Sequence, residues 1–161
     1  MTAIVYVSNT GSAKTYAEML GEKTGFDVYS LADSGSVPDG AQVIFIGWVM
    51  AGALQGLKEA RERFGSLRAV IAVGMMKSEK QDGDLKEKNA ITEPFFSLPG
   101  AFDIKKLTGM YKMMMGMMVK MMKSKLKETD DPKAKEIAEK FEEGFDLVDE
   151  KHLSEVLEFL K

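Results

Sequence analysis

Five short apolar runs, separated by segments with helical spacing, constrain the fold of this chain more than any other feature. The runs are residues 3–7, 26–31, 42–47, 68–74 and 95–98. The segments with helical spacing are residues 14–23, 54–64, 82–90, 104–127, a short stretch that ends at Phe141, and residues 150–160. Strands that alternate with helices are joined by right-handed crossovers and form a parallel sheet. The sequence therefore predicts an α/β fold, a three-layer sandwich around a parallel sheet of five strands.

The order of the strands determines where a ligand can bind. Strands of this kind commonly adopt the order 2-1-3-4-5, which places the loops after the first and third strands on either side of a switch point. Ligands bind at such a point, and the two most unusual loops of the sequence occupy these positions. Because the sequence contains no repeat and no linker, we predict a single domain over residues 1–161.

The absence of cysteine excludes several kinds of chemistry. With no Cys and one His, the chain cannot form a disulfide, a thiolate zinc site, an iron–sulfur cluster, a cysteine nucleophile or a histidine-rich metal centre. Any redox activity must then come from a bound cofactor. Residues 1–7 carry no basic segment and too few apolar residues for a signal peptide or a membrane span. We therefore expect a cytoplasmic protein, and we assign no catalytic residue and no metal site.

The loop after the first strand is rich in hydroxyl groups. It consists of Ser8, Asn9, Thr10, Gly11, Ser12 and Ala13, directly before a helix. Free backbone amides, the helix dipole and hydroxyl donors together form a phosphate-binding site at a helix N-terminus. Ser and Thr also cap helices, but a cap explains only one or two such residues. We predict that this loop binds a phosphate group.

Other kinds of phosphate-binding loop fit these residues less well. A P-loop would have Gly in place of Ser8 and Ala13, although Lys14 and Thr15 match its last two residues. The dinucleotide fingerprint GxGxxG is absent, and a receiver domain would carry Asp at the end of the third strand, where this chain has Gly47. The terminal phosphate of a mononucleotide is the ligand class that fits best.

Residues 4–18 resemble the opening of flavodoxin-like proteins, whose first loop carries Ser/Thr-x-Thr-Gly-x-Thr and binds the phosphate of FMN. The last Thr of that motif is Ala13 here, which removes a hydroxyl donor but leaves the backbone amides. Residues 95–103 and 144–149 resemble segments of one branch, which includes the menaquinone-dependent protoporphyrinogen dehydrogenases and short flavodoxin-domain proteins. The resemblance spans nearly the whole chain and implies a flavodoxin-like fold with FMN as cofactor.

The resemblance also implies where the isoalloxazine ring lies. In the family the loop after the third strand wraps the ring, and here it contains Trp48, Val49, Met50, Ala51 and Gly52. The single Trp of the chain suits contact with a flat heteroaromatic ring, although a Trp in a domain of this size can also simply pack in the core. We expect a third contact from Gly74, Met75 and Met76, after the fourth strand.

A basic, methionine-rich segment interrupts an otherwise acidic chain. Residues 104–127 contain seven Lys, no Asp or Glu, and eight of the 13 Met. Since the net charge of the chain is −3, the remainder carries −10. The pattern predicts an extra amphipathic helix. Its Met side contains Met110, Met114, Met117, Met118 and Met121, and its Lys side contains Lys105, Lys112, Lys120, Lys123 and Lys127.

Three interpretations of this helix remain open. Either its Met side packs on the sheet and its Lys side is solvated, or the segment from Met110 to Lys127 makes a peripheral contact with the inner face of the membrane. The Met side could equally receive a flat hydrophobic partner, and the lysines could attract the carboxylates of a ligand. The charged lysines would prevent this helix from spanning the membrane. Nucleic acid is a poor partner because the rest of the chain would repel phosphates.

Three functions follow from these observations. The first is an FMN-binding protein that acts in electron transfer or as a flavin-dependent oxidoreductase, with a redox protein or a small hydrophobic substrate as its partner. The second, implied by the resemblance, is a protoporphyrinogen dehydrogenase-like enzyme that uses quinone at the membrane surface. The third is a non-enzymatic binding module that kept the fold and lost FMN, indicated by Ala13 and the altered segment at Trp48. A bound flavin would itself supply the redox chemistry, so the first function requires no catalytic side chain.

Overall fold

The computed structural model describes residues 1–75, 78–106, 109–126 and 131–161. The chain forms two compact units. The first unit combines Met1–Gly100 with Val148–Lys161, and the second unit is Ala101–Leu147. The second unit is therefore an insertion in the sequence of the first. The single domain predicted for residues 1–161 stays a prediction.

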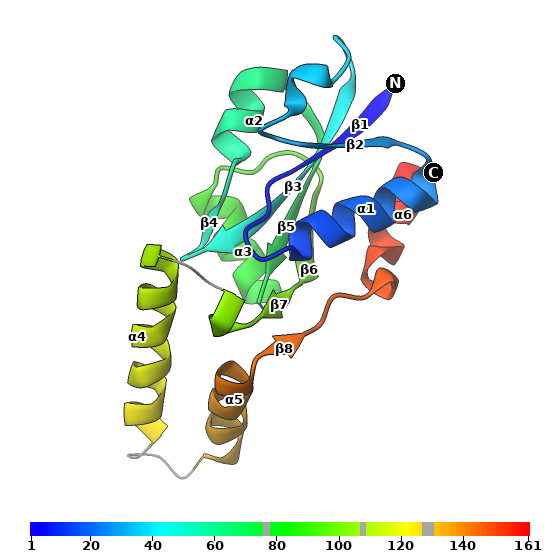
Figure 1. Ribbon diagram of the computed structural model, residues 1–161. Coiled ribbons are helices and arrows are strands. Elements are labelled where there is room, and N and C mark those ends of the chain that lie inside the picture. The colour runs from blue at the N-terminus through cyan, green and yellow to red at the C-terminus, as the bar shows by residue number, and fades with distance from the viewer. Residues whose placement is uncertain (76–77, 107–108, 127–130) are drawn as a thin grey trace. The chain divides into compact units, whose positions relative to one another are not determined.

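A parallel sheet forms the centre of the first unit (Figure 1). Its strands are β1 (Thr2–Tyr6), β2 (Asp27–Ser30), β3 (Gln42–Met50), β5 (Leu67–Gly74) and β6 (Phe95–Pro99). They lie in the order β2-β1-β3-β5-β6, which is the predicted 2-1-3-4-5 once the short β4 (Ala53–Leu54) is set aside. β4 pairs antiparallel with the end of β3. The predicted α/β, flavodoxin-like arrangement is confirmed.

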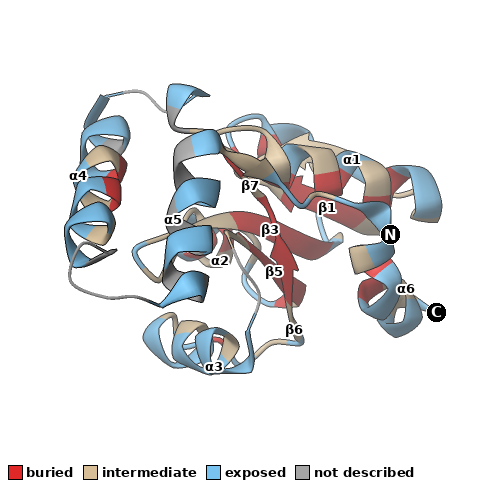
Figure 2. Ribbon diagram, turned by 90° about the horizontal axis from the view of Figure 1, so that it is seen from below, coloured by how far each residue is buried: buried red, intermediate tan, exposed pale blue. Residues whose placement is uncertain are grey.

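Helices cover both faces of this sheet (Figures 1 and 2). The helices are α1 (Ser12–Thr24), α2 (Leu57–Phe64), α3 (Glu79–Lys88) and α6 (Ser154–Leu160), with single 3₁₀ turns at Ser34–Ser36 and Glu150–Leu153. Successive residues of a strand point to opposite faces. Ile44 accordingly packs in the core beneath α1 and α6, whereas its neighbours Val43 and Phe45 pack in the core beneath α2. The apolar run predicted at residues 42–47 is therefore buried on both sides, and the three layers follow from it.

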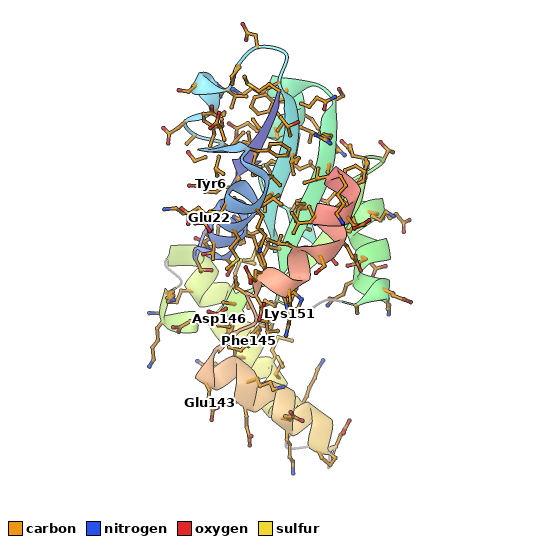
Figure 3. The ribbon with its side chains drawn as sticks, turned by 90° about the vertical axis from the view of Figure 1, so that its right-hand side faces the viewer. Tyr6, Glu22, Glu143, Phe145, Asp146 and Lys151 are labelled. Carbon is orange, nitrogen blue, oxygen red and sulfur yellow. The ribbon has the colours of Figure 1, made fainter. Side chains whose placement is uncertain are left out.

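In its described residues, the second unit contains two α-helices and a small antiparallel sheet. Its elements are β7 (Ala101–Phe102), a 3₁₀ turn at Ile104–Lys106, α4 (Gly109–Leu126), α5 (Pro132–Glu143) and β8 (Phe145–Asp146). α4 packs against α5. β7 pairs antiparallel with β8, and the rings of Phe102 and Phe145 lie 6.0 Å apart between centroids. Phe145 and Asp146 are labelled in Figure 3.

The amphipathic helix differs from the prediction in its bounds and in the face that it buries. α4 begins at Gly109, which has a φ of +60°, and residues 107, 108 and 127 of the expected helix lie outside the described residues. Among the side chains of α4 that the structure describes, Met115 and Val119 are buried, and Met118 and Met122 are half-buried beside them. The other four residues of the predicted Met side, Met110, Met114, Met117 and Met121, are 43–65% exposed. These four side chains are therefore not buried by the packing of α4 within the second unit, and packing of this side on the sheet stays a prediction.

One methionine and one valine thus form the buried stripe of α4, and the helix carries more apolar residues than this stripe contains. Among the described residues, no helix is long and apolar enough to cross a membrane.

Candidate functional site

The loop between β1 and α1 is a compact turn that its own hydroxyl groups hold in place. Tyr6, labelled in Figure 3, ends β1, and α1 begins at Ser12. The N–H of Gly11 donates to Ser8 Oγ at 3.0 Å, and Thr15 Oγ1 donates to the carbonyl oxygen of Gly11 at 2.9 Å. Gly11 has a φ of 108°, a conformation that glycine adopts without strain. Because Ser8 accepts a hydrogen bond here, its own O–H can still donate to a ligand.

The N-terminus of α1 presents donors rather than acceptors. Gly11 offers no side chain to cap the helix, and the first turn contains no acidic residue. The first amides of a helix have no partner within it, and the helix dipole adds a partial positive charge there. Ala13 is buried in the core beneath α1, so it can take part in binding only through its N–H. The loop therefore keeps the features that a phosphate group needs, although the hydroxyl of the family motif is missing.

The ends of β5 and β6 lie beside this loop. The Tyr16 hydroxyl of α1 donates to the carbonyl oxygen of Pro99 at 2.5 Å, at the end of β6. The N–H of Gly100 donates to the carbonyl oxygen of Gly74 at 2.6 Å, at the end of β5. A Cβ atom on Gly100 would lie 3.5 Å from the Cβ of Ser12, so the first loop approaches this backbone closely. Sequence reasoning treated Pro99 and Gly100 only as the end of a strand and missed their place beside the loop.

The segment predicted to wrap the flavin ring is a β-hairpin. Its residues are Trp48, Val49, Met50, Ala51 and Gly52. The first three extend β3, and Val49 pairs with Leu54 of β4. Ala51 and Gly52 form the turn, with φ values of 50° and 77°, and positive φ at both positions is typical of a type I′ hairpin turn. The predicted end of the third strand at Gly47 is wrong, because Trp48 and Val49 continue β3 to Met50. Contact between this segment and the flavin ring stays a prediction.

The end of α3 fastens this hairpin. Asn89 Oδ1 accepts from the N–H of Leu54, and Asn89 Nδ2 donates to the carbonyl oxygen of Gly52, both at 2.9 Å. Lys88 Nζ donates to the carbonyl oxygen of Ala51 at 2.6 Å. The hairpin is thus held in place by hydrogen bonds from Lys88 and Asn89 and is not an open loop. Sequence reasoning missed Lys88 and Asn89 because they belong to a polar segment that looked like a solvated helix.

Met75 completes the group of residues at this edge of the sheet. It is half-buried and follows β5 directly, while Met76 lies outside the described residues. Because the strands are parallel, their carboxyl ends face the same edge. The structure therefore brings Met75 and the loop from Ser8 to Ala13 to one edge, and it attaches the hairpin that starts at Trp48 to that edge through β3. Ligand binding by these residues stays a prediction.

A bidentate ion pair between Arg61 and Glu93 lies next to Asn89, the residue that binds the hairpin. Arg61 Nε and Nη2 donate to the two carboxylate oxygens of Glu93 at 2.9 and 2.7 Å, and Arg61 Nη1 donates to the carbonyl oxygen of Asn89 at 3.0 Å. The hydrogen bond from Arg61 holds the pKa of Glu93 below its ordinary value, and burial opposes this shift. The Glu93 carboxylate likewise raises the pKa of Arg61. The pair connects α2 to the residue whose side chain fastens the hairpin.

We expect Glu93→Gln to lower the free energy of unfolding by about 1–2 kcal/mol near neutral pH, since it removes a charge-assisted bidentate pair. A carboxylate with a lowered pKa stabilises the fold above its ordinary pKa of 4.5, and this contribution is lost as the pH falls through the lowered value. The difference between wild type and variant should therefore shrink in acid. Denaturant unfolding at neutral and acidic pH measures it, with Glu87→Gln, an exposed position on α3, as the control. A difference that is the same at both pH values would contradict this account.

Comparison with known proteins gives one match. A family model described as the flavodoxin domain matches residues 3–130, which include the first loop, the hairpin and β6. No curated protein and no solved structure matches the chain. The strand order of the sheet and the position of the first loop agree with this match. The chain belongs to the flavodoxin-domain family.

Proposed function

We propose that the chain binds FMN, with the phosphate in the loop from Ser8 to Ala13, and acts in electron transfer or as a flavin-dependent oxidoreductase. The observation that carries the proposal is the N-terminus of α1, which has neither a capping side chain at Gly11 nor an acidic residue in its first turn. Membership of the flavodoxin-domain family makes FMN the expected ligand with a terminal phosphate. The Ser8 hydroxyl and the first amides of α1 supply donors for it.

The residues around this loop have roles that follow from their placement. The first turn of α1 would hold the phosphate, and the absence of a Cβ at Gly100 leaves room beside Ser12. We expect the half-buried Trp48 and the turn at Ala51 and Gly52 to limit the space for the ring, together with Met75. Flavin supplies hydride or one-electron chemistry when it is bound. The chain itself needs only to bind, orient and shield it.

Flavin retention tests the proposal directly. We expect the purified protein to show flavin absorbance bands, and denaturation to release a chromophore that is identified as FMN by its mass. If the chain is purified without flavin, added FMN should bind at least about tenfold more tightly than riboflavin, because the phosphate contributes several charge-assisted hydrogen bonds. Equal affinity for the two flavins would contradict the role of the first loop. A chain that binds neither would be the binding module that kept the fold and lost FMN.

A protoporphyrinogen dehydrogenase-like activity with quinone is a second candidate. Residues 95–103 and 144–149 resemble segments of that branch, and the structure pairs their ends with each other, Phe102 opposite Phe145 in β7 and β8. The two segments therefore form one local structure at the base of the inserted unit. Flavin-loaded protein should then reduce a menaquinone analogue while it oxidises protoporphyrinogen. If the protein retains FMN and catalyses neither half of this reaction, electron transfer remains as the proposed function.

A further inference from the structure

α4 exposes a continuous stripe of methionine side chains. Its five members, Met110, Met113, Met114, Met117 and Met121, are 43–65% exposed and are here called the methionine stripe. With 3.6 residues per turn they fall within one side of the helix. The buried stripe at Met115 and Val119 lies on another side, so the methionine stripe is not the face that packs against α5. Scattered exposed apolar residues are ordinary, but a continuous stripe indicates a surface that binds something.

Positive charge borders the methionine stripe. Lys120 and Lys125 are exposed and lie next to its two long sides on the helix. Lys112, also exposed, extends the positive side beyond Lys120. No Asp or Glu occurs in residues 104–127, so no carboxylate of this segment offsets these charges. The occupant of this surface should therefore present apolar groups with negative charge around them.

An anionic lipid bilayer fits this description better than the other partners. Unbranched methionine side chains adapt to the irregular boundary between headgroups and acyl chains, and lysines beside them reach the lipid phosphates. A second copy of α4 would place rows of lysine opposite one another, which is repulsive. Single-stranded nucleic acid would find no aromatic side chain in the methionine stripe on which bases could stack. The lysines around α4 would also prevent the helix from spanning the bilayer.

We propose that the methionine stripe of α4 binds the surface of an anionic bilayer, with the helix lying in the interface and its lysines among the headgroups. This goes beyond flavin binding and does not depend on it. The protein would then be recruited to membranes through its inserted unit, and the flavodoxin-like unit need not touch the lipid.

Vesicle co-sedimentation of the full chain tests the charge and the apolar parts separately. We expect binding to vesicles of phosphatidylglycerol mixed with phosphatidylcholine, and binding at least about tenfold weaker to pure phosphatidylcholine. Lys120→Gln with Lys125→Gln should weaken binding to the anionic vesicles by about 20-fold. The matched control is Lys58→Gln with Lys80→Gln, two exposed lysines of the first unit, which should bind like wild type. Added salt should weaken the wild-type interaction as well.

The apolar contribution is tested by replacing Met117 and Met121 with Gln, a residue of similar size and good helix propensity. Binding should fall by more than about tenfold while the helical circular dichroism is unchanged. If that variant unfolds, wild-type protein provides the same test by peroxide oxidation and mass spectrometry. Vesicles should protect Met117 and Met121 from oxidation but not Met1, which is 81% exposed on the first unit.

Several outcomes would overturn the proposal. Equal binding to anionic and neutral vesicles, absence of binding to either, or Gln variants that bind like wild type would each do so. A dimer in solution that the Met117 and Met121 variant abolishes, without any vesicle binding, would instead assign the methionine stripe to self-association. Flavin content is measured on the same preparations, so failure of FMN binding is distinguished from failure of membrane binding.

Discussion

Ser12→Asp is expected to weaken FMN binding by about a hundredfold without destabilising the fold. Ser12 is the first residue of α1, and an acidic residue there interacts favourably with the helix dipole, so the free energy of unfolding should stay the same or rise by about 0.5 kcal/mol. The same carboxylate would face the dianionic phosphate of FMN and repel it. Opposite effects on stability and on affinity are the signature of an anion site at this helix N-terminus. Isothermal titration and denaturant unfolding measure the two quantities.

Two comparisons isolate the charge in this experiment. Ser12→Asn has nearly the same shape as Ser12→Asp and no charge, so it should lose no more than about fivefold in FMN affinity. Riboflavin, which has no phosphate, should bind the Ser12→Asp protein about as well as it binds wild type. If Ser12→Asp loses FMN and riboflavin to the same extent, the loop does not hold the phosphate, and the proposed orientation of the flavin is wrong.

Gly47→Ala is expected to lower the free energy of unfolding by about 3 kcal/mol. A Cβ atom at this position would lie 2.6 Å from the carbonyl oxygen of Gln55 and 2.9 Å from the ring of Phe45. The first contact is with backbone that the hairpin fixes, so the new methyl group cannot be accommodated by a side-chain rotation. The hairpin has to move away from β3. Denaturant unfolding measures the loss, and the hydrogen exchange of the Leu54 amide should rise with it.

Gly83→Ala is the control for this prediction, and its expected sign is opposite. Gly83 lies within α3, and a Cβ atom there would have no heavy atom within 4 Å. Alanine in a helix interior is favoured over glycine, so this variant should be more stable by about 0.5–1 kcal/mol. If Gly47→Ala proves as benign as Gly83→Ala, the close approach of β3 and the segment after β4 is not a constraint on the fold.

The strands of the first unit could be predicted because each depends mainly on its own residues. The run at residues 42–47 contains consecutive apolar side chains, and the structure buries alternate members on opposite faces of the sheet. The position of the first loop followed from the strand and helix on either side of it. The sequence could not indicate that Thr15 and Ser8 hold the loop closed, since those bonds depend on the conformation of Gly11.

The surroundings of the first loop and the hairpin could not be predicted, because their contacts join residues far apart in the chain. The Tyr16 hydroxyl reaches Pro99, 83 positions later, and Asn89 meets Gly52, 37 positions earlier. Nothing near Asn89 distinguishes it from other polar residues of a solvated helix. Its role follows only from the position of α3 beside β4.

The sequence by itself determined the α/β class and the place of the loop between β1 and α1, because hydrophobic periodicity and helix-start chemistry act over a few neighbouring residues. The order of the strands followed from the order that is common in sheets of this kind. Composition also located the basic, methionine-rich helix. Only the tertiary structure decided which side of that helix is exposed, because burial depends on the neighbour that packs against α4 rather than on the pattern. From the helical wheel, the side of α4 that contains Met117 was expected to be its apolar, packing side. In the structure, the side that contains Met115 is the buried one, where α4 packs against α5, and the methionine stripe is exposed.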